Sequence, residues 1–154
     1  MNRLRIAKWS SCTLAIAAVM IMSCWAFAEK APMTKEQLQS TATHVVVGKV
    51  QAIYSRKELK RSYQYTHYVA EVKVDKLEKG EGISGLVYVR YLDIEWIGKG
   101  SMPPGPSGHY PSPTVGETYR IYLAQNAYDG MNNENKDAGY NVIYGNGFQP
   151  VKQP

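Results

Sequence analysis

Cysteine is scarce in this chain of 154 residues, which contains only Cys12 and Cys24. Both lie within the first 28 residues, so a chain that starts after them has no disulfide and no thiol chemistry. Histidine is also rare. His44, His67 and His109 are far apart in the sequence, and no His-Glu-x-x-His or paired-cysteine motif is present. We therefore predict no metal site and no other cofactor.

The start of the chain is typical of an export signal. Three basic residues among the first eight are followed by an apolar run over residues 13–22, which is short for a membrane span. Ala26-Phe27-Ala28 then places small residues at the positions that signal peptidase recognises. We predict that residues 1–28 are a signal peptide cleaved after Ala28, and that the protein is exported to the periplasm or the extracellular space.

A second interpretation of the same segment stays open. Ile21-Met22-Ser23-Cys24 resembles a bacterial lipobox, in which the cysteine receives the lipid. Lipidation of Cys24 would anchor the protein to a membrane and would suit a structural or accessory protein of the envelope. Only in that case do we predict a membrane partner.

Most of the chain's excess of positive over negative charge lies in the signal segment. The chain has 18 basic and 13 acidic residues, and three of the basic residues precede residue 29, which leaves 15 against 13. A domain so close to neutrality has no general electrostatic attraction to a polyanion. We therefore predict no nucleic-acid partner.

The remaining chain is long enough for one domain with a core. Residues 29–42 are predicted to hold a short helix over 35–40, because Thr34 and Gln37 fit a capping box. Residues 43–148 are predicted to form a β domain, and residues 149–154 a C-terminal tail.

Alternating and β-branched residues predict five strands, at 43–56, 63–77, 86–92, 118–124 and 140–144. In the first strand, Val46, Val50 and Ala52 are predicted to share one face, and Gly48 marks a bend or bulge. Residues 56–61 read as a charged hairpin region. Residues 93–116, which are rich in proline and glycine and contain Trp96, read as a long loop.

This strand order predicts an all-β fold with one short helix, namely a five-stranded OB-like antiparallel barrel. An open sandwich with a Greek-key connection is the alternative.

Three segments carry a resemblance at the level of strand pattern: His44-Val-Val-Val-Gly-Lys-Val50, Tyr68-Val-Ala-Glu-Val-Lys-Val74 and Val115-Gly-Glu-Thr-Tyr-Arg-Ile-Tyr-Leu123. Together they resemble small exported OB domains, including netrin-like domains and the tissue inhibitors of metalloproteinases. The chain also resembles uncharacterised exported bacterial proteins with a Gly-Pro-Ser-Gly-His segment, here residues 105–109. The inhibitors chelate zinc through an N-terminal cysteine, which a chain starting at Glu29 does not have, so the resemblance implies the fold without the inhibitory mechanism.

Aromatic residues provide the best candidate site. OB barrels bind ligands on the face of their second and third strands and in the adjoining loops. The residues predicted to line such a face are Tyr63, Tyr65, Tyr88, Arg90, Trp96, His109 and Tyr110. The chain is therefore predicted to be a non-enzymatic binding module whose ligand is an envelope protein or a glycan. The competing interpretation is that these tyrosines only pack across strands.

An enzyme is the other alternative. A small hydrolase or metal-dependent enzyme would be centred on His109, with Ser107 or Asp93 beside it. No Gly-x-Ser-x-Gly motif is present. Asp93 and Glu95 are predicted to project to one side, but nothing in the sequence separates their pKa values as paired catalytic carboxylates require.

Overall fold

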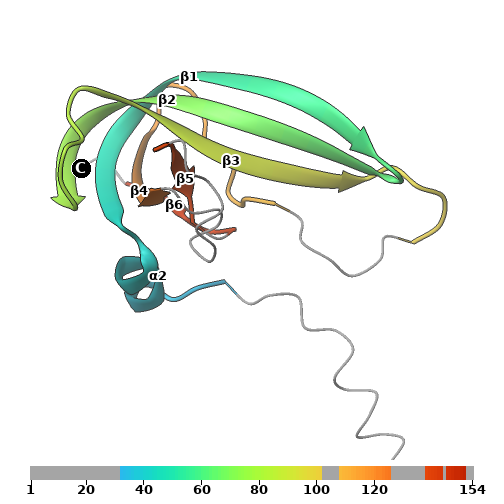
Figure 1. Ribbon diagram of the computed structural model, residues 1–154, viewed down its shortest axis with the longest axis horizontal. Coiled ribbons are helices and arrows are strands. Elements are labelled where there is room, and N and C mark those ends of the chain that lie inside the picture. The colour runs from blue at the N-terminus through green and yellow to red at the C-terminus, as the bar shows by residue number, and fades with distance from the viewer. Residues whose placement is uncertain (1–31, 102–107, 126–137, 144, 152–154) are drawn as a thin grey trace, which may run out of the picture. The chain divides into compact units, whose positions relative to one another are not determined.

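The computed structural model describes residues 32–101, 108–125, 138–143 and 145–151. This part of the chain is mostly β, with one short helix (Figure 1). The predicted cleavage site at Ala28, the alternative lipidation site at Cys24 and the hydroxyl of Ser107 lie outside the described residues.

Helix α2, Lys35–Thr41, begins with the predicted capping box. The Gln37 amide donates to Thr34 Oγ1 at 3.2 Å, and the Thr34 amide donates to Gln37 Oε1 at 2.8 Å. Two amide donors without partners inside the helix are thereby satisfied. Leu38 is fully buried in a small cluster with Val45, Tyr122 and Ile143, which fastens the helix to the start of the sheet.

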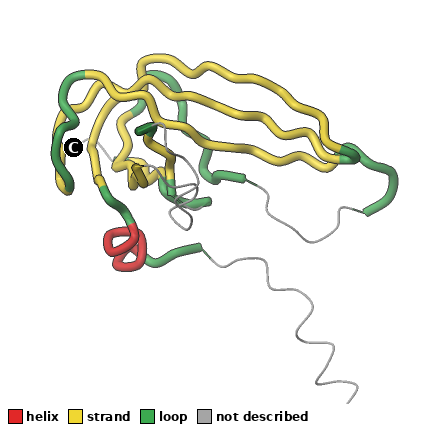
Figure 2. The backbone as a smooth tube through the Cα atoms, in the orientation of Figure 1, coloured by secondary structure: helices red, strands yellow, loops and turns green. Residues whose placement is uncertain are grey.

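One six-stranded sheet contains all the strands of the described residues (Figure 2). They are β1 His44–Lys60, β2 Tyr63–Lys79, β3 Leu86–Trp96, β4 Thr118–Gln125, β5 Tyr140–Val142 and β6 Phe148–Pro150. The order is β1-β2-β3-β5-β4-β6, and β1 also pairs with β4. Five strands therefore form a ring, with β6 attached to β4. The β3–β5 pair is parallel and the other pairs are antiparallel.

β1 belongs to both sides of this ring. It pairs with β2 along its length, whereas β4 pairs only with His44–Lys49. The β1–β2 register shifts at three places, namely between Val45 and Val46, between Val47 and Gly48, and between Val50 and Ala52. The predicted bulge at Gly48 is thus confirmed. The shift between Val50 and Ala52 reverses the alternation, so Ile53 instead of the predicted Ala52 packs against the core.

The hydrophobic core fills the inside of the ring. Every strand of the ring contributes alternate side chains to it, as the strand pattern predicts. Its buried members are Val46, Val50, Ala70, Val72, Ile83, Val87, Val89, Tyr91, Tyr119, Ile121, Leu123, Val142 and Phe148.

The boundaries differ from the predictions most clearly at three places. The charged run is not a hairpin loop, since β1 continues to Lys60 and the turn is only Arg61 and Ser62. The long loop begins after Trp96, because β3 continues that far. Residues 148–150 form β6, so the predicted C-terminal tail begins inside a strand.

Candidate binding face on the outer side of the sheet

Strands β1, β2 and β3 continue together beyond the ring (Figure 1). The pairing of β1 with β4 stops at Lys49, and that of β3 with β5 stops at Arg90. We call the continuation, residues 54–60, 63–67 and 92–96, the arm. None of its residues belongs to either hydrophobic cluster found in the described part of the chain. The arm therefore adds surface without adding to the core.

Three aromatic rings lie on the side of the arm that faces away from the core, which we call the outer face. Tyr63 and Trp96 are partners across β2 and β3, and their rings pack edge to face with centroids 4.8 Å apart. Tyr65 follows on β2, with its centroid 6.4 Å from that of Tyr63. Trp96 Nε1 is buried and has no hydrogen-bond partner among the described residues.

Charged side chains of β1 lie beside these rings. Lys60 Nζ is 5.6 Å from the centroid of Tyr65 and 3.1 Å from Glu58 Oε1. The hydrogen bond from Lys60 lowers the pKa of Glu58. The other carboxylate oxygen of Glu58 is 3.3 Å from His67 Nε2. A lysine, a carboxylate, an imidazole and aromatic rings are thus interleaved over β1 and β2.

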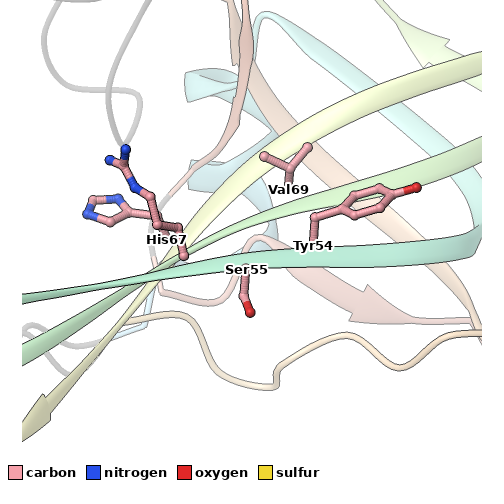
Figure 3. A pocket seen from close by; sticks show the side chains of 5 residues that line it. Tyr54, Ser55, His67 and Val69 are labelled. Atoms are coloured by element: carbon pink, nitrogen blue, oxygen red, sulfur yellow. The ribbon is translucent and has the colours of Figure 1, made fainter.

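A shallow, open hollow of about 340 Å³ lies further along the same strands. It is lined by Tyr54, Ser55, Arg56, His67 and Val69. Figure 3 shows Tyr54, His67 and Val69 on one side of the strands and Ser55 on the other. This hollow is too open to enclose a small molecule, since pockets for such ligands bury most of the ligand's surface.

Tyr88 and Arg90 extend the outer face along β3 toward the ring. Tyr88 is 54% exposed and lies opposite Glu71, whose negative charge raises the pKa of the Tyr88 hydroxyl. Arg90 is half-buried between Val69 of β2 and Asn141 of β5. The structure therefore places the predicted residues Tyr63, Tyr65, Tyr88, Arg90 and Trp96 on one face.

His109 does not share this face. It is buried, and its ring packs edge to face on the core residue Tyr91, with centroids 6.0 Å apart. Nε2 lies 3.0 Å from the Val142 carbonyl oxygen. Nδ1 lies 2.9 Å from the carbonyl oxygen of Leu92 and 3.2 Å from its amide nitrogen. Both ring nitrogens are therefore engaged by the backbone, which holds the loop after β3 against the sheet.

Tyr110 also lies apart from the cluster. It is 83% exposed in the loop that follows His109, and the described residues include no ring packed against it. Tyr110 is therefore not part of the outer face as we define it.

The carboxylates considered for catalysis have local partners. Asp93 and Glu95 share one side of β3, as predicted, with Thr66 and Gln64 opposite them. Asp93 Oδ1 accepts the Ile94 amide at 2.9 Å, and Glu95 Oε2 accepts Gln64 Nε2 at 3.0 Å. Within the described ranges, no three histidine, cysteine, aspartate or glutamate side chains are grouped in a way that could hold a metal ion.

Sequence reasoning missed the contribution of β1 to this face. Tyr54, Arg56, Glu58 and Lys60 alternate with the side chains of the opposite face, and their partners are Val69, His67, Tyr65 and Tyr63. The two-residue period through residues 54–60 was a signal for a strand. The dense charge of residues 56–61 indicates a solvated turn instead, and this led to the wrong prediction there.

Comparisons with known proteins give this face no precedent, since no protein-family model, curated protein or solved structure matches the chain. The described residues contain no helix whose length and hydropathy would let it span a bilayer.

Proposed function

We propose that this chain is an exported, non-enzymatic binding module of the bacterial envelope, built on an OB-like barrel, and that its ligand is a protein. The ring order β1-β2-β3-β5-β4 supports the barrel, because the OB fold is a five-stranded Greek-key barrel that binds on its second and third strands. The signal-like first 28 residues support export.

The observation that carries the proposal is the composition of the outer face. Tyr63, Tyr65 and Trp96 lie together on an arm that contributes nothing to the core, and Arg56 and Arg90 lie on the same side. Tryptophan, tyrosine and arginine are the residues that most often carry the binding energy of protein interfaces. A fold that needed only stability would gain little from placing them there.

The shape of the face favours a protein over a glycan. The hollow beside Tyr54 is shallow and open, and Tyr63 and Trp96 pack edge to face instead of offering parallel ring faces to successive sugars. Protein interfaces combine such broad surfaces with a mixed apolar and charged rim. A glycan remains the alternative that the experiment below distinguishes.

The buried state of His109 supports a role other than catalysis. A general base must reach the proton that it removes, whereas both nitrogens of this ring are within hydrogen-bonding distance of backbone atoms. His109 is therefore better explained as a residue that holds the loop to β3.

Photo-crosslinking tests the proposal in producing cells. With p-benzoylphenylalanine at position 65, we expect irradiation to give one discrete adduct with a second protein, because this half-buried ring belongs to the aromatic cluster and packs beside Tyr63. The same residue at position 73, which is on the same strand and face but outside the arm, is the matched control. Trp96→Ala should remove the adduct at position 65.

Two results would count against a protein ligand. A protease-resistant, heterogeneous adduct would indicate a glycan. Equal labelling from positions 65 and 73, or an adduct that survives Trp96→Ala, would mean that the outer face of the arm is not the binding site.

A further inference from the structure

The far end of the arm carries two exposed aliphatic side chains. β1 ends at Lys60 and β3 ends at Trp96, so these strand ends lie together beside the short turn (Figure 1). Leu59 is 67% exposed and Ile97 is 49% exposed. The Ile97 amide donates to the Ser62 carbonyl oxygen at 2.9 Å, which holds Ile97 beside the turn. We call residues 59–63 and 96–97 the tip.

Positive charge surrounds these aliphatic residues. Residues 56–61 and 95–99 together hold five lysines and arginines but only two glutamates. One of these, Glu58, is paired with Lys60 at 3.1 Å, and the other, Glu95, accepts a hydrogen bond from Gln64. The tip is therefore positive, although the chain after residue 28 is close to neutral.

A pair of aromatic side chains lies at the same end of the arm, on the outer face, whereas Leu59 is on the opposite face beside Gln64. Tyr63 and Trp96 pack on each other, and Gly98 folds over the indole so closely that a Cβ there would be 2.3 Å from Cζ2. Tyrosine and tryptophan have apolar bodies and polar ends, and they favour the boundary between lipid and water. The end of the arm thus combines exposed aliphatic side chains, an aromatic pair on the outer face and flanking cations, which is the composition that a membrane surface attracts.

We propose that the tip docks on the surface of an anionic lipid bilayer. Leu59 and Ile97 would enter the headgroup region, Trp96 and Tyr63 would lie at its boundary, and the surrounding cations would contact lipid phosphates. A soluble polyanion would satisfy the cations but would give the aliphatic residues no apolar medium, so the composition favours lipid. This contact does not need a lipid on Cys24, and it goes beyond the proposed binding of a protein partner.

The test uses the chain from Glu29 onward, because the leader's apolar run would itself bind lipid and residues 32–154 form a compact unit of their own. Trp96 is then the only tryptophan and reports on the tip directly. With vesicles of equimolar phosphatidylglycerol and phosphatidylcholine, we expect co-sedimentation, a blue shift of Trp96 fluorescence and quenching by brominated acyl chains. Pure phosphatidylcholine vesicles should bind at least about tenfold more weakly.

Matched substitutions separate the contribution of the aliphatic side chains to lipid binding from that of the positive charges. Leu59→Ser should weaken binding to the mixed vesicles about tenfold, whereas Leu86→Ser, at a comparably exposed leucine at the other end of β3, should not. Lys60→Gln with Arg61→Gln should weaken it about 20-fold or more, whereas Lys49→Gln with Lys73→Gln, an exposed pair outside the arm, should have little effect.

Two results would overturn the proposal. Absence of binding to the mixed vesicles is one. The other is binding that Leu59→Ser leaves unchanged and that dextran sulfate reproduces at equal affinity, because the tip would then be a site for polyanions only. Neither result depends on whether the outer face crosslinks to a protein.

Discussion

Replacing Tyr91 with alanine is expected to lower the free energy of unfolding by about 3–5 kcal/mol. Tyr91 lies at the centre of the core, where its ring stacks on Tyr68 with centroids 4.7 Å apart and planes 9° apart. Phe148 packs edge to face on it at 5.2 Å, and His109 does so at 6.0 Å. Removing this ring leaves a cavity between three other rings that are attached to different strands or loops.

Tyr91→Phe is the matched control. Burial raises the pKa of the Tyr91 hydroxyl, but the packing contacts with Tyr68, Phe148 and His109 are all made by the ring. We therefore expect Tyr91→Phe to change stability by no more than about 1 kcal/mol. Urea unfolding followed by circular dichroism measures both variants. Similar losses for alanine and phenylalanine would mean that the hydroxyl, and not the stacked ring, stabilises the core.

Replacing Gly48 with alanine is expected to cost about 2–3 kcal/mol, which is large for the addition of one methyl group. A Cβ at this position would lie 2.5 Å from the Lys73 carbonyl oxygen and 2.7 Å from Val72 Cγ1. Gly48 pairs with β2 on one side and with β4 on the other, so β1 cannot move away from one strand without disturbing the other.

The neighbouring residue supplies the control for Gly48. Lys49 is exposed on the same stretch of β1, and Lys49→Ala should stay within about 0.5 kcal/mol of the parent chain. The urea midpoint of Gly48→Ala should fall while the midpoint of Lys49→Ala is unchanged. Equal midpoints for all three chains would show that β1 and β2 can separate at this point without cost, and the proposed reason for the glycine would be wrong.

Local sequence patterns predicted most of the ring but not its extension. Val72 and Val89 are buried and alternate with residues that are not, and such a period indicates one buried face. The same rule placed Ala52 on the wrong face, because a bulge adds one residue and no single-strand pattern shows where the extra residue falls. The strand at Phe148 was missed because it is short and exists only through its pairing with β4.

The candidate face was predictable only in part, because some of its residues come together only through the pairing and packing of separate strands. Tyr63 and Tyr65 alternate on an obvious strand, so their shared side follows from the sequence. Trp96 reaches that side only because β3 continues past Asp93, into a segment whose charges and following glycines suggest a loop. His109 was placed with the ligand-binding residues because its loop is near the third strand in sequence, but which side of the sheet it packs on depends on tertiary contacts.

The central claim is that the outer face of the arm is covered by a partner in the cell, and thiol protection tests it most directly. The chain after residue 28 has no cysteine, so Tyr65→Cys and Lys73→Cys each introduce one unique thiol on β2, about 26 Å apart along the strand. A small maleimide is applied to intact producing cells and to the purified protein. We predict that the thiol at position 65 reacts readily when purified and slowly in cells, while the thiol at position 73 reacts readily in both. Equal reactivity of the thiol at position 65 in cells and in the purified protein would contradict the claim.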